Sequence, residues 1–333
     1  MPATTTRRTV AVLVLIPVVA ALALWAFAWP TARLAPRDLP VGVAGPAAAT
    51  AQLEQSLARH EGAFEVHRYA NAGAAREAIE DRAVYGAAVV TPRGPELLTA
   101  TAASPVVAQL LREAFAAQLP AGTQPKVVDV VPAPAADPRG SAFASSLLPL
   151  AISGAAAGAV VTLLGLRGLR AGATLVGAAA LAGLTGAALA DSWLGALTGS
   201  WWAEAGVLGL TVLAIGGTMA GLGALLGPRG LGLGGLLMIL IGNPFSGVAS
   251  APQLLPEPAG LLGQWLPPGA AGTALRSVAF FDGNGAGDAL LVLSLWAAAG
   301  LTAVLAAGRR GGVPVPAQDS PSRAARPASE PVG

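Results

Sequence analysis

Apolar and polar stretches divide this chain unevenly. A first apolar stretch runs from about Thr9 to Pro30, and a largely polar segment then extends to about Ser141. Five more apolar stretches follow in close succession and end at Arg309. A helix of roughly 20 mostly apolar residues crosses the ~30 Å hydrocarbon core of a bilayer. The pattern therefore predicts six transmembrane helices, with one folded domain between the first and the second.

The five later stretches differ in regularity. Asn243 and Pro244 interrupt the fourth of them, and a proline removes a backbone donor and kinks or ends a helix. The spans predicted after the first one are Phe143–Leu164, Gly172–Ala190, Ala205–Leu226, Leu231–Ser250 and Ala289–Gly308.

The first stretch has two interpretations. Arg7 and Arg8 precede it, and Ala26-Phe27-Ala28 resembles a signal-peptide cleavage site. Its apolar part of about 20 residues is longer than the 7–15 residues of a signal peptide. We therefore expect a retained helix, with cleavage as the alternative.

The polar segment alternates the patterns of strands and helices. Asn71 and Ser104 are each placed to cap a helix, and Pro105 suits the first helical position. This alternation predicts a small α/β domain with mostly parallel strand pairing. The expected strands are Leu39–Ala44, Phe64–Tyr69, Tyr85–Val90, Glu96–Thr101 and Lys126–Val131. The expected helices are Ala47–His60, 71–81 and 104–119.

Arginines in the short connections predict the orientation. They fall in alternate connections, which places all of them on one side, and the positive-inside rule makes that side the cytoplasm. Both termini are then cytoplasmic, whereas residues 31–141 and the loops Asp191–Glu204 and Pro252–Asp288 are extracytoplasmic. Six of the seven tryptophans fall at or near the outer boundaries, as interfacial tryptophans do. The arginines are Arg7, Arg8, Arg167, Arg170, Arg229, Arg309 and Arg310.

The composition agrees with a membrane protein and excludes several classes. Apolar residues make up 54% of the chain and charged residues 11%, about half the charged share of a soluble domain. A net charge of +2 gives no basis for a nucleic-acid partner. Without cysteine there is no disulfide or thiolate site. Lys126 is the only lysine among 20 basic residues, which is typical of a high-GC bacterium and makes a bacterial cell membrane the expected location.

Candidate chemistry is sparse. His60 and His67 are the only histidines, and no carboxylates accompany them at metal-ligand spacing, so surface or structural roles are favoured over a metal site. No phosphate-binding loop with its lysine occurs. We also expect no ionisable residue in the middle of a span. The sequence therefore predicts no enzyme, no catalytic residue, no cofactor and no metal, and any transport would draw its energy from a partner.

Small residues recur at four-residue spacing in the apolar stretches. Such pairs let helix backbones approach closely inside a membrane. Packing within the chain is the favoured interpretation, and a dimer interface is the alternative. The pairs are Gly154/Gly158, Gly217/Gly221 and Gly223/Gly227.

The loop before the last span is too apolar for a solvated loop and too broken for a span. Residues 243–287 contain several prolines, the run Leu266-Pro267-Pro268-Gly269 and a helix-like stretch from Ala270 to Phe281. A segment that re-enters the outer leaflet is favoured, since irregular backbone is tolerated at membrane depth where protein covers it. The alternative is an amphipathic cap that lies flat on the membrane.

The chain resembles the type-2 ABC exporter permease fold (ABC-2), and within it the YhgE/Pip-like branch. The stretches that carry the resemblance are Leu39–Ala44, Ala74–Val90 with Thr91-Pro92, and Asn243–Gly247 with Leu266–Gly269. The resemblance implies a membrane subunit of an exporter, driven by a separate cytoplasmic ATPase and paired as a homodimer or with a similar permease. Members of the YhgE/Pip branch act instead as accessory proteins of secretion or as phage receptors.

Two features depart from the exporter pattern. Only about eight residues precede the first span, where exporters place an amphipathic helix, and Gly165–Ala171 is short for a coupling helix. Arg167 and Arg170 could contact a partner, although the positive-inside rule also explains them. The expected fold is a polytopic α-helical membrane protein with a small extracytoplasmic α/β domain.

The expected division of the chain has four parts. They are an N-terminal tail with transmembrane helix 1 (1–30), the extracytoplasmic α/β domain (31–141), a five-helix transmembrane domain (142–310) with a re-entrant outer loop (243–287), and a disordered cytoplasmic tail (311–333).

Overall fold

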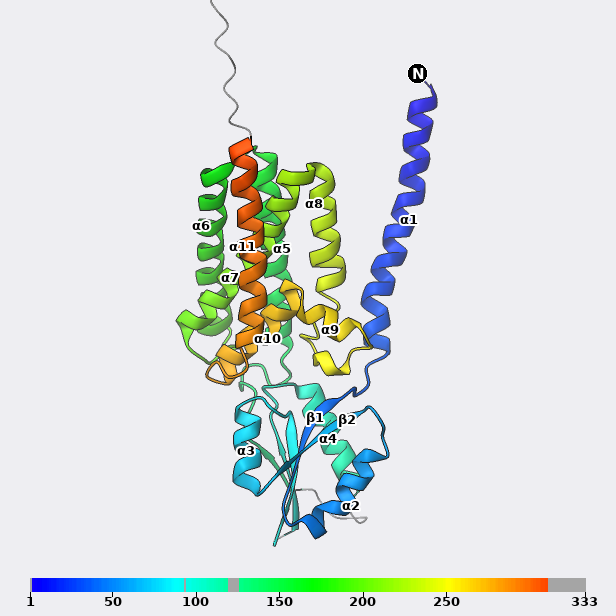
Figure 1. Ribbon diagram of the computed structural model, residues 1–333, viewed down its shortest axis with the longest axis vertical. Helices are drawn as coiled ribbons and strands as arrows, with labels where there is room; N and C mark the ends of the chain where they lie inside the picture. Colours follow the sequence, from blue (N-terminus) through cyan, green and yellow to red (C-terminus); the bar gives the residue numbers. More distant parts are fainter. Residues whose placement is uncertain (1, 93, 119–125, 311–333) are drawn as a thin grey trace, which may run out of the picture.

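The computed structural model describes residues 2–92, 94–118 and 126–310. Helices form a bundle, and a five-stranded sheet with its own helices lies at one end of it (Figure 1). We call these parts the bundle and the sheet domain, and the two ends of the bundle the sheet end and the far end. The tail predicted to be disordered, residues 311–333, lies outside the described residues.

Among the described residues, five helices are long and apolar enough to cross a membrane, which is compatible with the predicted membrane protein. Each overlaps a predicted span. α1 begins seven residues earlier than predicted, at Pro2, and every other helix end lies within four residues of its prediction. A π-helical turn, η1 (Ala188–Trp193), prolongs α6. The start of α1 and the end of α11 both lie at the far end (Figure 1). The five helices are α1 (Pro2–Ala32), α5 (Ser141–Leu163), α6 (Gly168–Ala187), α7 (Trp201–Leu226) and α11 (Gly287–Arg310).

The stretch predicted as a span at Leu231–Ser250 forms a shorter helix. It consists of α8 (Pro228–Gly235) and a π-helical continuation, η2 (Leu236–Gly242), and it ends before Asn243. Pro244 explains the end, because it has no N–H to continue the helical hydrogen bonds. The last eight residues of the predicted span therefore belong to the irregular segment that follows.

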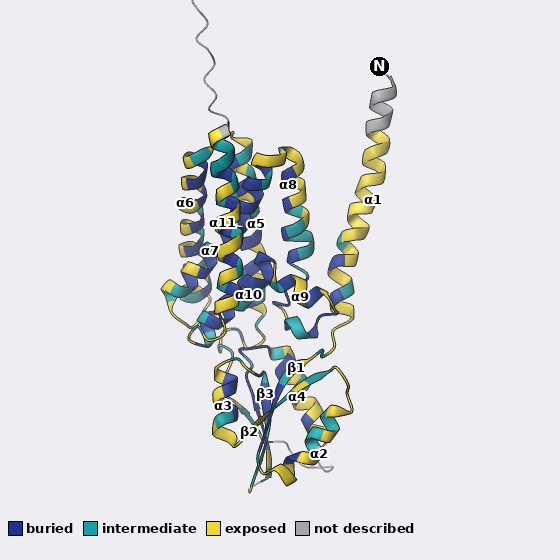
Figure 2. Cartoon of the chain, viewed as in Figure 1, coloured by how far each residue is buried: buried dark blue, intermediate teal, exposed yellow. Residues whose placement is uncertain are grey.

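α7 is the central helix of the bundle. Buried residues make up 78% of its most apolar window, against 6% in α1 and about 30% in the other three long helices (Figure 2). α1 stands apart along most of its length and packs near the sheet end, where Trp25 and Trp29 meet Phe245 (Figure 1).

Glycines allow the close approach of helices around α7. A Cβ added at Gly158 would lie 2.4 Å from the Gly216 carbonyl oxygen, and one at Gly300 would lie 2.2 Å from the Gly217 carbonyl carbon. These contacts join α5 and α11 to α7, so packing within the chain is confirmed for the first two predicted pairs. Gly227 instead forms the turn between α7 and α8, at φ 62°.

The sheet has the order β2-β1-β3-β4-β5, and every pairing is parallel except that of β3 with β4. Asn71 and Ser104 cap helices as predicted: the Asn71 side chain accepts from Ala74 N (3.0 Å) and Ser104 Oγ accepts from Val107 N (3.2 Å). The strands are β1 (Leu39–Ala44), β2 (Phe64–Tyr69), β3 (Gly86–Thr91), β4 (Gly94–Thr99) and β5 (Lys126–Asp129). The helices are α2 (Ala47–Ala58), α3 (Ala72–Glu80) and α4 (Pro105–Ala116).

Each face of the sheet carries its own apolar core. Residues of α3 pack on one face and residues of α2 and α4 on the other, and neighbours such as Leu97 and Leu98 in β4 face opposite cores. The connecting segment, residues 243–287, contributes Phe281 to the first core and Ala251 and Leu254 to the second. This segment contains η3 (Pro252–Leu254), α9 (Ala259–Gln264) and α10 (Pro267–Phe280).

Candidate functional site

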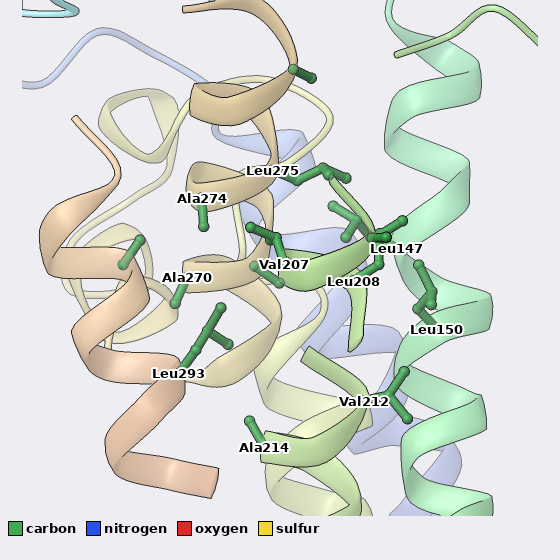
Figure 3. Packing of buried hydrophobic residues seen from close by; sticks show 14 of the residues in the cluster. Leu147, Leu150, Val207, Leu208, Val212, Ala214, Ala270, Ala274, Leu275 and Leu293 are labelled. Carbon is green, nitrogen blue, oxygen red and sulfur yellow. The ribbon is translucent and has the colours of Figure 1, made fainter. Parts of the chain in front are cut away.

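α10 lies between the bundle and the sheet domain, and most of its residues are buried. Pro267 and Pro268 occupy its first positions, where a missing N–H costs nothing. Ala270, Ala274 and Leu275 face the bundle and share one apolar cluster with its helices (Figure 3). The bundle residues labelled in that cluster are Leu147, Leu150, Val207, Leu208, Val212, Ala214 and Leu293.

Polar contacts fasten the sheet domain to the connecting segment. They add to the apolar contribution of Phe281 and Leu254, and they come from several elements of the sheet domain and from the linker before β1. The contacts are Arg37 Nη1 to Leu254 O (2.9 Å), Tyr85 OH to Gln253 Oε1 (2.9 Å) and Asn284 Nδ2 to Asp81 Oδ1 (3.2 Å).

Arg82 makes the contact closest to the middle of α10. It follows α3 with φ 62°, a left-handed conformation that glycine normally takes at a helix end. From there its Nη1 donates to Thr273 O (3.1 Å) and to Ser277 Oγ, and its guanidinium lies 5.3 Å from the centre of the Phe281 ring. These contacts offset the backbone strain. They join Arg82 to side chains and backbone that lie 191 to 199 positions further along the chain.

Arg276 is the second guanidinium of the interface and is 6% exposed. Its Nη2 donates to Val248 O (2.9 Å), and the group lies 4.6 Å from the centre of the Phe143 ring at the start of α5. Its Nε has no hydrogen-bond partner among the described residues. Burial, and secondarily the charge of Arg82, lowers the pKa of Arg276 to about 10, so the side chain keeps its charge at neutral pH.

Neither arginine has a carboxylate partner among the ion pairs of the described residues. Burial also lowers the pKa of Arg82, and the electrostatic influence of Tyr85 opposes that change. Burial raises the pKa of Tyr85, so its hydroxyl is neutral and donates to Gln253. Two nearby cations thus share an interface without a counter-ion from the described chain.

Glu204 is another buried ionisable residue, and its position differs from the prediction. It was expected at the end of an extracytoplasmic loop, but α7 begins at Trp201 and includes Glu204, whose side chain is completely buried. Its Oε1 accepts from Gly199 N (2.9 Å), which closes the first turn of α7, while Oε2 has no partner among the described residues. The adjoining Thr198 Oγ1 donates to Ala279 O (3.3 Å), so this turn also supports the end of α10.

A narrow cavity opens between the sheet domain and the start of α5. Arg276, Phe143 and Asp137 line it, together with the exposed Arg139. Its enclosed part measures about 10 Å³, which holds about one water molecule, and it reaches about 340 Å³ when its open mouth is included. Asp137 is engaged in capping α5, since it accepts from Phe143 N (2.8 Å) and Ser141 Oγ (3.2 Å).

A larger groove lies on the sheet face that carries α2 and α4. Its volume is about 1000 Å³, and its lining includes Leu53, Leu57 and Phe115 as well as the exposed Arg59 and His60. Small-molecule sites usually measure about 300–1,000 Å³ and are mostly apolar with a few polar groups. The groove therefore has the size and lining of a binding surface.

The histidines singled out in the sequence lie apart from the α10 interface. His67 Nε2 is 3.4 Å from Glu65 Oε1 at the surface, and His60 stands edge-on to Phe64. The described residues contain no group of three His, Asp or Glu side chains that could hold a metal ion. Arg82 and Arg276, which carry the interface, have no sequence motif, because only their distant contacts distinguish them from surface arginines.

Comparison with known proteins gives no further assignment: no protein-family model, no curated protein and no solved structure matches this chain.

Proposed function

We propose that this chain is the membrane subunit of an ABC-2-type export system that a separate ATPase powers. One observation carries the proposal: α10 is buried against the bundle on one side and bonded to the sheet domain on the other. A displacement of α5, α7 or α11 would reach the sheet domain through α10, since close-packed interiors deform little. An exporter needs such coupling if its energy enters at the bundle and its cargo meets the outer domain.

The proposed arrangement has six crossings of a bacterial cell membrane, with Pro228–Gly242 as the short one. Both termini lie in the cytoplasm and the sheet domain lies outside. The positions of the arginine-bearing connections at the far end support this orientation. α1 leaves most of its length uncovered, which supports pairing with a second copy or with a similar permease.

The ATPase would dock on the far end. The connection between α5 and α6 is short, and it packs against the end of α11, because a Cβ at Gly308 would lie 2.4 Å from Gly168 Cα. Arg167 and Arg170 stand at this connection and would supply the cationic part of the contact. Because this docking surface is small, each of its charges would contribute a large share of the ATPase binding energy.

Co-purification of the full-length protein from its native membrane tests the proposal. We expect a nucleotide-binding ATPase in stoichiometric amount with the wild type, and its loss with the double variant Arg167→Glu/Arg170→Glu. The matched control is Arg76→Glu/Arg112→Glu, which changes the same charge on exposed residues of the sheet domain. Wild-type protein that carries no ATPase at all would contradict the export proposal.

The groove between α2 and α4 favours a second candidate, a non-transporting YhgE/Pip-like envelope or secretion-accessory protein that acts through its outer domain. Here the same co-purification would yield envelope or secretion proteins without an ATPase. Leu57→Glu in the groove would abolish that capture, whereas Ala72→Glu on the exposed surface of α3 would leave it unchanged. Equal capture by both variants would exclude the groove as the binding surface.

A further inference from the structure

The charge balance around Arg276 is incomplete within the described chain. A buried charge is costly unless it is paired, and Arg276 is more than nine-tenths buried with a free Nε. Arg82 lies close enough to act on it electrostatically, and Arg139 lines the same cavity. The single carboxylate of the cavity, Asp137, accepts hydrogen bonds from the start of α5. Two guanidiniums, those of Arg276 and Arg139, thus line the cavity beside one occupied carboxylate, and the charge of Arg82 acts on Arg276 in addition.

The cavity continues into a polar groove on the sheet domain. The two hollows share Thr101, Pro105 and Arg139, and the second one adds both Arg112 and Glu113 and has a volume of about 370 Å³. A ligand could therefore place one small anionic group in the narrow cavity and extend along the groove. The enclosed part has room for about one water molecule, so an oxygen atom of the ligand would enter while its bulk stays at the mouth.

We propose that this cavity is a phosphate-binding site, in which Arg276 and Arg139 hold the oxyanion of a phosphate group. Guanidinium groups present several N–H donors in a fixed plane that matches phosphate oxygens. Arg276 supplies a buried positive charge that lines the cavity from within, and Arg139 closes the site at the surface. The site lies at the junction of the bundle with the sheet domain, so both a lipid headgroup and a soluble phosphate compound can supply this chemistry.

The test uses the purified full-length protein and two probes. Inorganic phosphate is titrated by calorimetry into protein that has been stripped of lipid, and retained phospholipid is measured by mass spectrometry after mild solubilisation. The variants are Arg139→Gln and Arg276→Gln. Arg76→Gln, which is exposed on α3, is the matched control. Because Arg276 is buried and its variant could fail to fold, the exposed Arg139 keeps the test valid by itself.

We expect Arg139→Gln to weaken the binding of the phosphate group at least about tenfold, and Arg276→Gln to weaken it further, with no change in Arg76→Gln. Arginine-dependent retention of phospholipid would identify a lipid headgroup as the source. Arginine-dependent binding of inorganic phosphate without retained lipid would identify a soluble phosphate, and either result supports the site. Wild-type protein that takes up neither probe, or equal binding in all variants, would overturn it.

Discussion

Replacement of Arg82 tests whether the sheet domain is fastened to α10 as the contacts indicate. Alanine removes two hydrogen bonds from a charged donor and the contact with the Phe281 ring. Charged hydrogen bonds contribute about 1.5–3 kcal/mol each and an exposed cation–π contact about 0.5–1 kcal/mol. Simple addition gives about 3.5–7 kcal/mol. Because Arg82 is half-buried and both hydrogen bonds come from the same Nη1, we expect no more than half of the lower limit, about 2 kcal/mol of docking free energy.

A second variant separates the side chain from the backbone. Glycine takes positive φ without the steric cost that an alanine bears, which is roughly 1 kcal/mol. Arg82→Gly should therefore weaken docking by about 1 kcal/mol less than Arg82→Ala. The pair of variants distinguishes lost contacts from relieved strain.

The assay exploits the absence of cysteine from the chain. Ala251→Cys introduces a single thiol at a site that is 1% exposed and lies in the core shared by the connecting segment and the sheet domain. When opening and closing are fast compared with labelling, the labelling rate is proportional to the fraction of molecules in which the two parts are separated.

In the Ala251→Cys background, Arg82→Ala should accelerate labelling about 30-fold, the factor that corresponds to 2 kcal/mol, and Arg82→Gly about fivefold. Arg76→Ala, on the exposed surface of α3, should leave the rate unchanged. A labelling rate that Arg82→Ala does not alter would refute the fastening role. Equal acceleration by both Arg82 variants would refute the contribution of backbone strain.

Two further predictions concern packing and pH. Gly300→Ala should destabilise the protein by about 1–3 kcal/mol, because its Cβ would meet Gly217 at 2.2 Å and the helices would have to separate by at least 0.8 Å to reach a 3.0 Å contact. Gly206→Ala, whose Cβ meets nothing within 4 Å, should be neutral or slightly stabilising in thermal unfolding. The labelling rate of Ala251→Cys, corrected for thiol ionisation, should stay constant between about pH 6 and 8. Across that window Arg276 stays protonated, since its pKa is lowered only to about 10, and Tyr85 stays uncharged, since its pKa is raised. A steep change in that rate would show that another titrating group controls docking.

Local pattern was sufficient to predict most elements. The caps at Asn71 and Ser104 and the strand at Leu39–Ala44 follow from side chains within a few residues of one another, so a single sequence indicates them. Long apolar stretches likewise predicted five helices of membrane-spanning length. The remaining stretch, Leu231–Ser250, was predicted to form too long a helix because apolar composition continues past Pro244, although the helix ends at Gly242.

Only the tertiary structure placed α10 and the two arginines. Arg82 meets residues 191 and 195 positions away, and no local pattern indicates which distant backbone will lie beside a given side chain. The groove between α2 and α4 depends in the same way on how far two helices stand apart on one sheet. The sequence by itself determined where the chain becomes helix or strand, because those choices depend on short-range geometry and hydrophobic period. The packing of the connecting segment between bundle and sheet decided which of its polar residues became buried, because burial depends on every element that surrounds them.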